Sequence, residues 1–194
     1  MKPDRSSGVN HLESGAPIRI GISSCLLGNE VRYDGGHKRE PLLADALLSD
    51  ELGAQIEWVA VCPEVEVGMG VPRPRLQLQD DAGQLRMLES ESGRDHTASM
   101  QRFAQQRVSE LRSLDLRGYV LKRGSPSCGM QGVAVHDERG EPRPRGRGLF
   151  AEALMQALPW LPVEEEGRLR DPLLRGDFLE RVRACHSRYL LGHV

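Results

Sequence analysis

Short apolar runs alternate with longer segments of helical periodicity along most of this sequence, and no other feature constrains the fold as strongly. The short runs predict four strands, over residues 18–22, 56–61, 118–121 and 161–165. The longer segments predict helices over residues 41–52, 96–114, 149–158 and 178–191. Strands that alternate with helices indicate an α/β fold, here a layered single domain with a mostly parallel sheet flanked by helices.

Three segments carry neither pattern. Residues 65–94 are rich in glycine, proline and arginine, and apolar stretches on either side of Asp80-Asp81-Ala82-Gly83 predict a small hairpin. Residues 137–148 are expected to form a polar loop. Residues 1–16 are polar and lack the apolar region of a secretory signal, so we expect a flexible leader.

Length, charge and cysteine content exclude several classes of protein. The chain has 194 residues, enough for one domain whose core needs no disulfides. Lysine and arginine number 26 against 28 acidic residues, so strong nucleic-acid binding is not expected. No apolar run approaches the ~18 residues that span a bilayer. Four cysteines are ordinary usage for an intracellular enzyme, and we expect a cytoplasmic protein that acts as a monomer.

Three of the four cysteines follow predicted strands. Cys25, Cys62 and Cys128 lie close to the carboxyl ends of three strands, among serine, glycine and proline residues. Ligands of parallel sheets bind at this edge, so the three thiols are expected to converge there. Cys185 instead shares a face of the last helix with apolar residues, so we expect it to be buried in the core.

Converging thiolates suit zinc, copper(I) or an iron–sulfur cluster. A structural zinc site needs a fourth ligand, for which His37 and His136 are the candidates. Three thiolates without a fourth protein ligand describe a catalytic cluster with one open iron. Two alternatives stay open at this point: a structural zinc-binding module, and a metal-free protein that handles thiols or persulfides.

Four segments together resemble the thiouracil desulfidase family of bacterial iron–sulfur domains. They are SSCLLGNEVRYDGG (23–36), VCPEVEVGMGVPRPR (61–75), LKRGSPSCG (121–129) and GRGLFAEAL (146–154). The resemblance implies an α/β domain over residues 17–165, with residues 166–194 as a helical tail packed on it. It also implies a [4Fe–4S] cluster held by Cys25, Cys62 and Cys128. Its open iron would take sulfur from 2-thiouracil or a related thiolated pyrimidine, releasing sulfide.

Five further residues are candidates for the reaction. Glu64, two residues after Cys62, is the candidate general acid/base, because a carboxylate beside the cluster can take a proton from the attacking water. Ser125 is the candidate catalytic hydroxyl, and Asp34, Arg73 and Ser127 are candidates for substrate binding. Each has a structural alternative: a helix cap for the glutamate, local turn hydrogen bonds for the serines and the aspartate, and surface ion pairs for the arginine.

Overall fold

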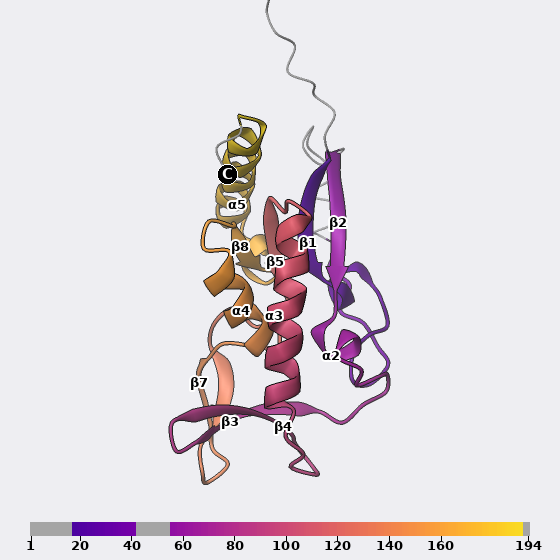
Figure 1. The fold of residues 1–194 in the computed structure, drawn as a ribbon, viewed down its shortest axis with the longest axis vertical. Coiled ribbons are helices and arrows are strands. Elements are labelled where there is room, and N and C mark those ends of the chain that lie inside the picture. The colour runs from indigo at the N-terminus through magenta and orange to yellow at the C-terminus, as the bar shows by residue number, and fades with distance from the viewer. Residues whose placement is uncertain (1–16, 42–54, 192–194) are drawn as a thin grey trace, which may run out of the picture.

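The computed structural model describes residues 17–41 and 55–191, and its main layer is a parallel sheet (Figure 1). Its strands are β1 (Ile18–Ser23), β2 (Ile56–Val61), β5 (Gly118–Leu121) and β8 (Val163–Glu165), in the order β2-β1-β5-β8. Every pairing among them is parallel, which confirms the predicted sheet. The expected leader and almost all of the helix expected at 41–52 lie outside the described residues.

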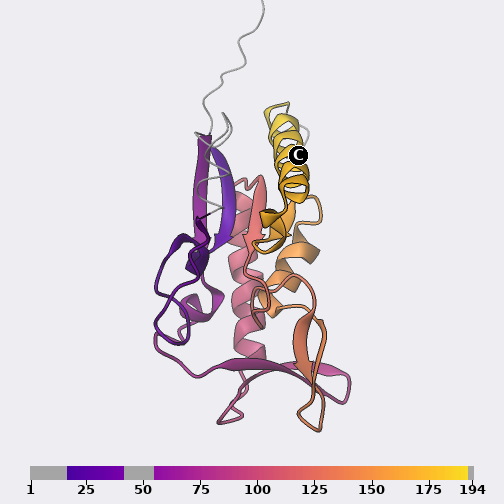
Figure 2. The same cartoon turned by 180° about the vertical axis from the view of Figure 1, so that it is seen from behind.

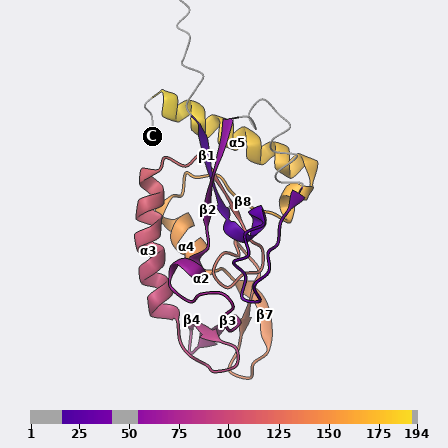
Figure 3. The ribbon, with the colours of Figure 1, turned by 90° about the vertical axis from the view of Figure 1, so that its right-hand side faces the viewer.

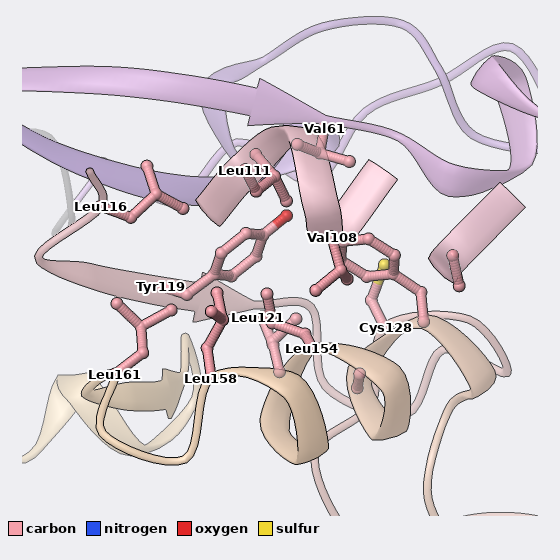
Figure 4. Packing of buried hydrophobic residues seen from close by; sticks show 13 residues of the cluster. Val61, Val108, Leu111, Leu116, Tyr119, Leu121, Cys128, Leu154, Leu158 and Leu161 are labelled. Carbon is pink, nitrogen blue, oxygen red and sulfur yellow. The ribbon is translucent and has the colours of Figure 1, made fainter. Parts of the chain in front are cut away.

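One face of this sheet packs against α3 (Thr97–Ser113) and α4 (Leu149–Ala157). Tyr119 and Leu121 of β5 point into this layer, where the tyrosine ring lies 6.0 Å from the ring of Phe150 (Figure 4). Gly21 of β1 makes room for the tyrosine, because a Cβ at this position would lie 2.2 Å from its ring. The sulfur of Cys128 belongs to the same cluster, so this core supports the candidate site directly.

The opposite face is covered by α5 (Pro172–Leu190), which follows the short 3-10 helix η3 (Arg168–Arg170). Figure 2 shows α5, in yellow, beside the strands of this sheet. Isoleucines 18, 20 and 22 of β1 pack there against Phe178 and Val182 of α5. The helix begins six residues earlier than the sequence analysis predicted. Asp171 accepts a hydrogen bond from the N–H of Leu173, and Pro172 occupies the first turn, so the start is a capped one.

A second four-stranded sheet lies beyond the carboxyl ends of the parallel strands (Figure 3). It contains β3 (Leu76–Asp81), β4 (Gln84–Glu89), β6 (Val133–His136) and β7 (Pro142–Gly146), in the order β4-β3-β6-β7. The antiparallel pair β3 and β4 confirms the predicted hairpin. The expected polar loop at 137–148 is wrong, because β7 runs antiparallel to β6 within it. Proline is tolerated there since β7 is an edge strand, which needs few of its backbone N–H groups for pairing.

The carboxyl ends of β1 and β2 each lead directly into a short helix. Residues Ser24–Leu27 form the 3-10 helix η1 after β1, and Pro63–Glu66 form α2 after β2. The loop after β5 instead forms hydrogen bonds with the start of α4. These three connections carry Cys25, Cys62 and Cys128. Within the described part of the chain, no helix is long and apolar enough to cross a membrane.

Candidate functional site

Cys25, Cys62 and Cys128 line one cavity of about 310 Å³ at the carboxyl edge of the parallel sheet. Cys25 and Cys128 are buried and Cys62 is partly exposed, and all three carry free thiols. The predicted convergence of the three cysteines is therefore confirmed. Cys185, the fourth, is buried on α5 and is not among the residues that line the cavity.

Burial dominates the acidity of the three thiols. It raises the pKa of Cys25 from 9.0 to about 11, although the nearby ammonium group of Lys122 opposes the rise. Burial also raises the pKa of Cys62, against hydrogen bonds from the backbone of Val65 and Glu64. Burial raises the pKa of Cys128 as well, while a hydrogen bond with Ser23 opposes the rise. Without a bound metal, all three thiols are protonated at neutral pH.

The first turn of α2 fixes the backbone of Cys62. Cys62 is the residue before the helix, and Pro63 occupies the first helical position, where a missing N–H costs nothing. The carboxylate of Glu66 turns back and accepts a 2.8 Å hydrogen bond from the N–H of Cys62. Arg107 of α3 in turn pairs with Glu66, at 2.9 Å. Through this ion pair, helix α3 supports the backbone at Cys62.

The loop that carries Cys128 is mounted on the first turn of α4. The carbonyl of Pro126 accepts from the N–H of Leu149, and that of Ser127 accepts from Phe150 and from the residue after it. Gly148 allows this close approach, because a Cβ there would lie 2.4 Å from the carbonyl of Ser127. The motif at 146–154 therefore contributes to the site by docking the cysteine loop.

Glu64 lines the cavity between two partners. The guanidinium of Arg73 donates to its Oε2 from Nη2 at 2.7 Å and from Nε at 2.9 Å. The hydroxyl of Ser127 donates to its Oε1 at 2.9 Å. Arg73 and Ser127, predicted as substrate-binding residues, thus meet at the predicted acid/base residue. Ser127 is fully buried and does not line the cavity.

Ser125 and Asp34 occupy different places. Ser125 lines the cavity, and its Oγ accepts hydrogen bonds from the backbone N–H groups of Ser127 and Cys128. Among the described residues, no hydrogen bond uses the hydroxyl proton of Ser125. Asp34 lies in an exposed turn, where its Oδ1 accepts from the N–H of Gly36, and it is not among the cavity-lining residues. Hydrogen bonding to Gly36 holds the pKa of Asp34 below its usual value. The structure therefore favours the turn interpretation for Asp34.

Several cavity-lining residues were missed by the sequence analysis. Ser23, at the end of β1, is buried and accepts from the N–H of Lys122 at 2.9 Å. The ammonium group of Lys122 pairs with Glu166 at 2.5 Å. Tyr33 contributes its ring to the rim, flanked by the guanidinium groups of Arg32 at 5.3 Å and Arg75 at 4.6 Å. The sequence signal available for Ser23 and Lys122 was their position next to a motif cysteine or at the end of a strand. Tyr33 had no comparable signal in the sequence.

A larger cavity, of about 500 Å³, lies between the second sheet and the start of α4. No cysteine or histidine lines it, and its charged side chains pair with each other, Arg145 with Asp80 and Arg147 with Glu152. Without a cysteine, the lining of this cavity cannot supply thiolate ligands. The cysteine cavity is therefore the candidate active site.

The donor set of the cysteine cavity fits a multinuclear cluster better than a single ion. Among the described residues, no group of three or more His, Cys, Asp or Glu side chains is arranged to hold a metal ion. His37 and His136, the candidate fourth ligands for zinc, do not line the cavity. His136 lies on β6, where its Nδ1 is 3.1 Å from the carbonyl of Leu78. Thiols on three separate loops suit a cluster in which each sulfur binds a different iron.

A parallel α/β sheet with three free thiols and a carboxylate around one cavity defines an α/β protein with a cysteine-lined site, whose donors are suited to thiolate ligation of a metal. The family model for 2-thiouracil desulfurase matches residues 20–166, so the chain belongs to that family. It is similar to the solved structure of TudS, a [4Fe–4S]-dependent thiouracil desulfidase, with a TM-score of 0.62 and 32% identity over 82% of this chain and 98% of that one. It is also 29% identical over 141 residues to the uncharacterized protein YbbK of Bacillus subtilis (strain 168), covering 70% of this chain and 89% of that protein.

Proposed function

We propose that this chain is a [4Fe–4S]-dependent desulfidase that removes the sulfur of 2-thiouracil or a related thiolated pyrimidine and releases sulfide. The observation that carries the proposal is the single cavity lined by Cys25, Cys62, Cys128 and Glu64. The three cysteines would hold the cluster, one thiolate on each of three irons. When bound, the cluster supplies an iron without a protein thiolate, which acts as a Lewis acid toward the substrate sulfur.

The chain's own residues supply the proton transfers. The overall reaction replaces C=S by C=O with one water, and both protons of that water leave with the sulfide, so no oxidant or reductant is needed. Glu64 takes a proton from the water while the water oxygen attacks the thiocarbonyl carbon. Glu64 later returns this proton to the departing sulfur. Ser125, whose hydroxyl proton is free, donates a hydrogen bond to the substrate and orients the ring.

The cavity and the charge of the chain favour a small-molecule substrate. A volume of about 310 Å³ lies at the lower end of ligand-sized pockets. The formal net charge of −2 gives no basic field for tight nucleic-acid binding. Four free cysteines are typical of proteins in reducing compartments, so we place the enzyme in the cytoplasm, and we expect it to act as a monomer.

The proposal is tested by anaerobic turnover of 2-thiouracil with the cluster-loaded protein. Wild type is expected to release uracil and sulfide in equal amounts. Cys62→Ala is expected to lose cluster and turnover together, whereas Cys185→Ala, the matched control outside the cavity lining, keeps both. Full turnover by Cys62→Ala would overturn the mechanism.

Glu64→Gln separates the acid/base role from the structural one. The amide keeps the size of the side chain but cannot take a proton. We expect normal iron content with turnover reduced about 10²- to 10⁴-fold, the range typical of a lost general acid or base. Loss of iron from this variant would make Glu64 a structural residue, and unchanged turnover would remove it from the reaction.

A further inference from the structure

We infer that Arg73 and Ser127 are positioning residues, which act on the reaction through Glu64 rather than through the substrate. Together they hold the glutamate carboxylate in one orientation and leave Oε1 as the atom that accepts the proton. This inference rests on the proposed function, because it assigns the supports of the acid/base residue of that same site.

The guanidinium of Arg73 uses most of its N–H donors in hydrogen bonds to other groups of the protein. Two of its N–H groups donate to Oε2 of Glu64. Nη1 donates to the carbonyl of Gly70 at 3.0 Å, and Nη2 also donates to the carbonyl of Val31 at 2.9 Å. A guanidinium has five N–H donors, so four are used in these contacts. The side chain is only 4% exposed, which leaves little of it to meet a substrate.

The hydroxyl of Ser127 is likewise used in a hydrogen bond within the protein. Its residue is fully buried, and its hydroxyl has one proton, which it donates to Oε1 of Glu64. The docking of its carbonyl on the first turn of α4 fixes its backbone. The hydroxyl therefore reaches the glutamate from a rigid element, as Arg73 does from the opposite oxygen.

These contacts make the two oxygens of Glu64 unequal. Oε2 receives two N–H groups of one cation, both from the same side, so its negative charge is neutralised by Arg73. Oε1 receives one neutral hydroxyl and keeps one lone pair free. Glu64 is 15% exposed and lines the cavity, so this lone pair is the site to which a cavity water can transfer its proton. A rotated carboxylate would present the oxygen that Arg73 already occupies.

Arg19 provides a matched control outside the cavity. Its guanidinium pairs with the carboxylate of Glu57 at 3.0 Å, and it is not among the residues that line the cavity. Arg73→Lys keeps the charge but loses the planar fork that grips one carboxylate. Arg19→Lys makes the same chemical change in an arginine–glutamate pair away from the acid/base residue.

The test is a set of double-mutant cycles, with iron content, kcat and KM measured for each cluster-loaded variant. We expect Arg73→Lys to lower kcat about 100-fold and Ser127→Ala about tenfold, with KM changed less than about twofold, because misorientation acts on the chemical step. Iron per chain should equal wild type. Arg19→Lys should leave kcat within about twofold. In a Glu64→Gln background, Arg73→Lys and Ser127→Ala should lower kcat by less than about twofold more.

Each outcome decides between positioning and another role. Losses that vanish in the Glu64→Gln background support the inference. Losses that multiply with that of Glu64→Gln, or that appear in KM, show direct contact with substrate and overturn it. Loss of iron shows a purely structural role and also overturns it. If Arg73→Lys fails to fold, Ser127→Ala carries the same test. Absence of turnover in wild type would instead contradict the proposed function itself.

Discussion

At the scale of single residues, burial decides what the three cavity cysteines can do. A thiol that acts as a free nucleophile needs a lowered pKa, because the thiolate is the reactive form. Burial moves the pKa values of Cys25, Cys62 and Cys128 in the opposite direction. Metal binding produces the thiolate form that the protein environment disfavours, since a bound metal displaces the proton from a thiol. The site is therefore built for metal ligation and not for thiol catalysis.

This difference predicts slow alkylation of the cluster-free protein. With a pKa of about 11, Cys25 has only about one thiolate in ten thousand molecules at pH 7. Its rate of reaction with iodoacetamide should rise about tenfold per pH unit up to pH 11. Peptide mass spectrometry of the labelled protein measures this rate, with the urea-unfolded chain as control. A single cysteine labelled rapidly at pH 7 would support the metal-free thiol protein instead.

The same pKa shift links pH to folding. The thiol of Cys25 stays protonated in the folded protein to a higher pH than the ordinary value of 9.0. Above pH 9 the unfolded chain therefore binds fewer protons than the folded one, and the free energy of unfolding falls as the pH rises toward 11. The contribution of the Cys25 thiol to the free energy of unfolding is fully present below pH 9. Urea unfolding of the cluster-free protein at pH 8 and pH 10.5 should show this loss, which Cys25→Ala reduces.

At the scale of elements, the first turn of α4 is the support on which the Cys128 loop depends. Gly148 stands where the helix and the loop come closest. We expect Gly148→Ala to displace the loop, to destabilise the protein by about 1–3 kcal/mol and to lower its iron content. Gly176→Ala is the control, since a Cβ there meets nothing within 4 Å and alanine favours the helix by up to about 1 kcal/mol. Iron analysis and urea unfolding of both variants check this. Normal iron content in Gly148→Ala would show that the docking is not needed.

The sequence predicted the helices and strands in which apolar residues recur regularly because one face is buried. Strands β1, β2 and β5 and helices α3 and α4 were predicted within one or two residues. Strands β6 and β7 were missed, because β6 has only four residues and β7 consists of Pro142–Gly146, a proline- and arginine-rich stretch that is largely exposed. Edge strands are recognised by their partners rather than by their own pattern. The β6–β7 half of the second sheet could therefore not be predicted from local sequence.

The candidate site shows the same limit. Strand ends predicted that the three cysteines meet, because topology alone brings them to one edge. The motifs pointed to Arg73 and Ser127 but not to their shared partner, since contacts of Glu64 across nine and 63 residues depend on the loops. The roles of the site residues, the three cysteines included, are predictions tested by the variants.

At the scale of the whole molecule, α5 completes the layered fold. It lies outside the family match at 20–166, yet Phe178 and Val182 are fully buried against the parallel sheet. We propose that residues 166–194 belong to the same folding unit as residues 17–165. Phe178→Ala should lower the free energy of unfolding by about 3–5 kcal/mol. Leu173→Ala, on an 83% exposed side chain of the same helix, should change it by less than about 0.5 kcal/mol. Equal effects in urea unfolding would refute this proposal.

The central claim is that this fold assembles a cluster on three cysteines from three separate loops. Iron and acid-labile sulfide per chain, measured after anaerobic purification, test it most directly. The account predicts about four of each in wild type and a clear loss in Cys25→Ala, Cys62→Ala and Cys128→Ala. Stoichiometric zinc in place of iron, or no metal after attempted reconstitution, would contradict it.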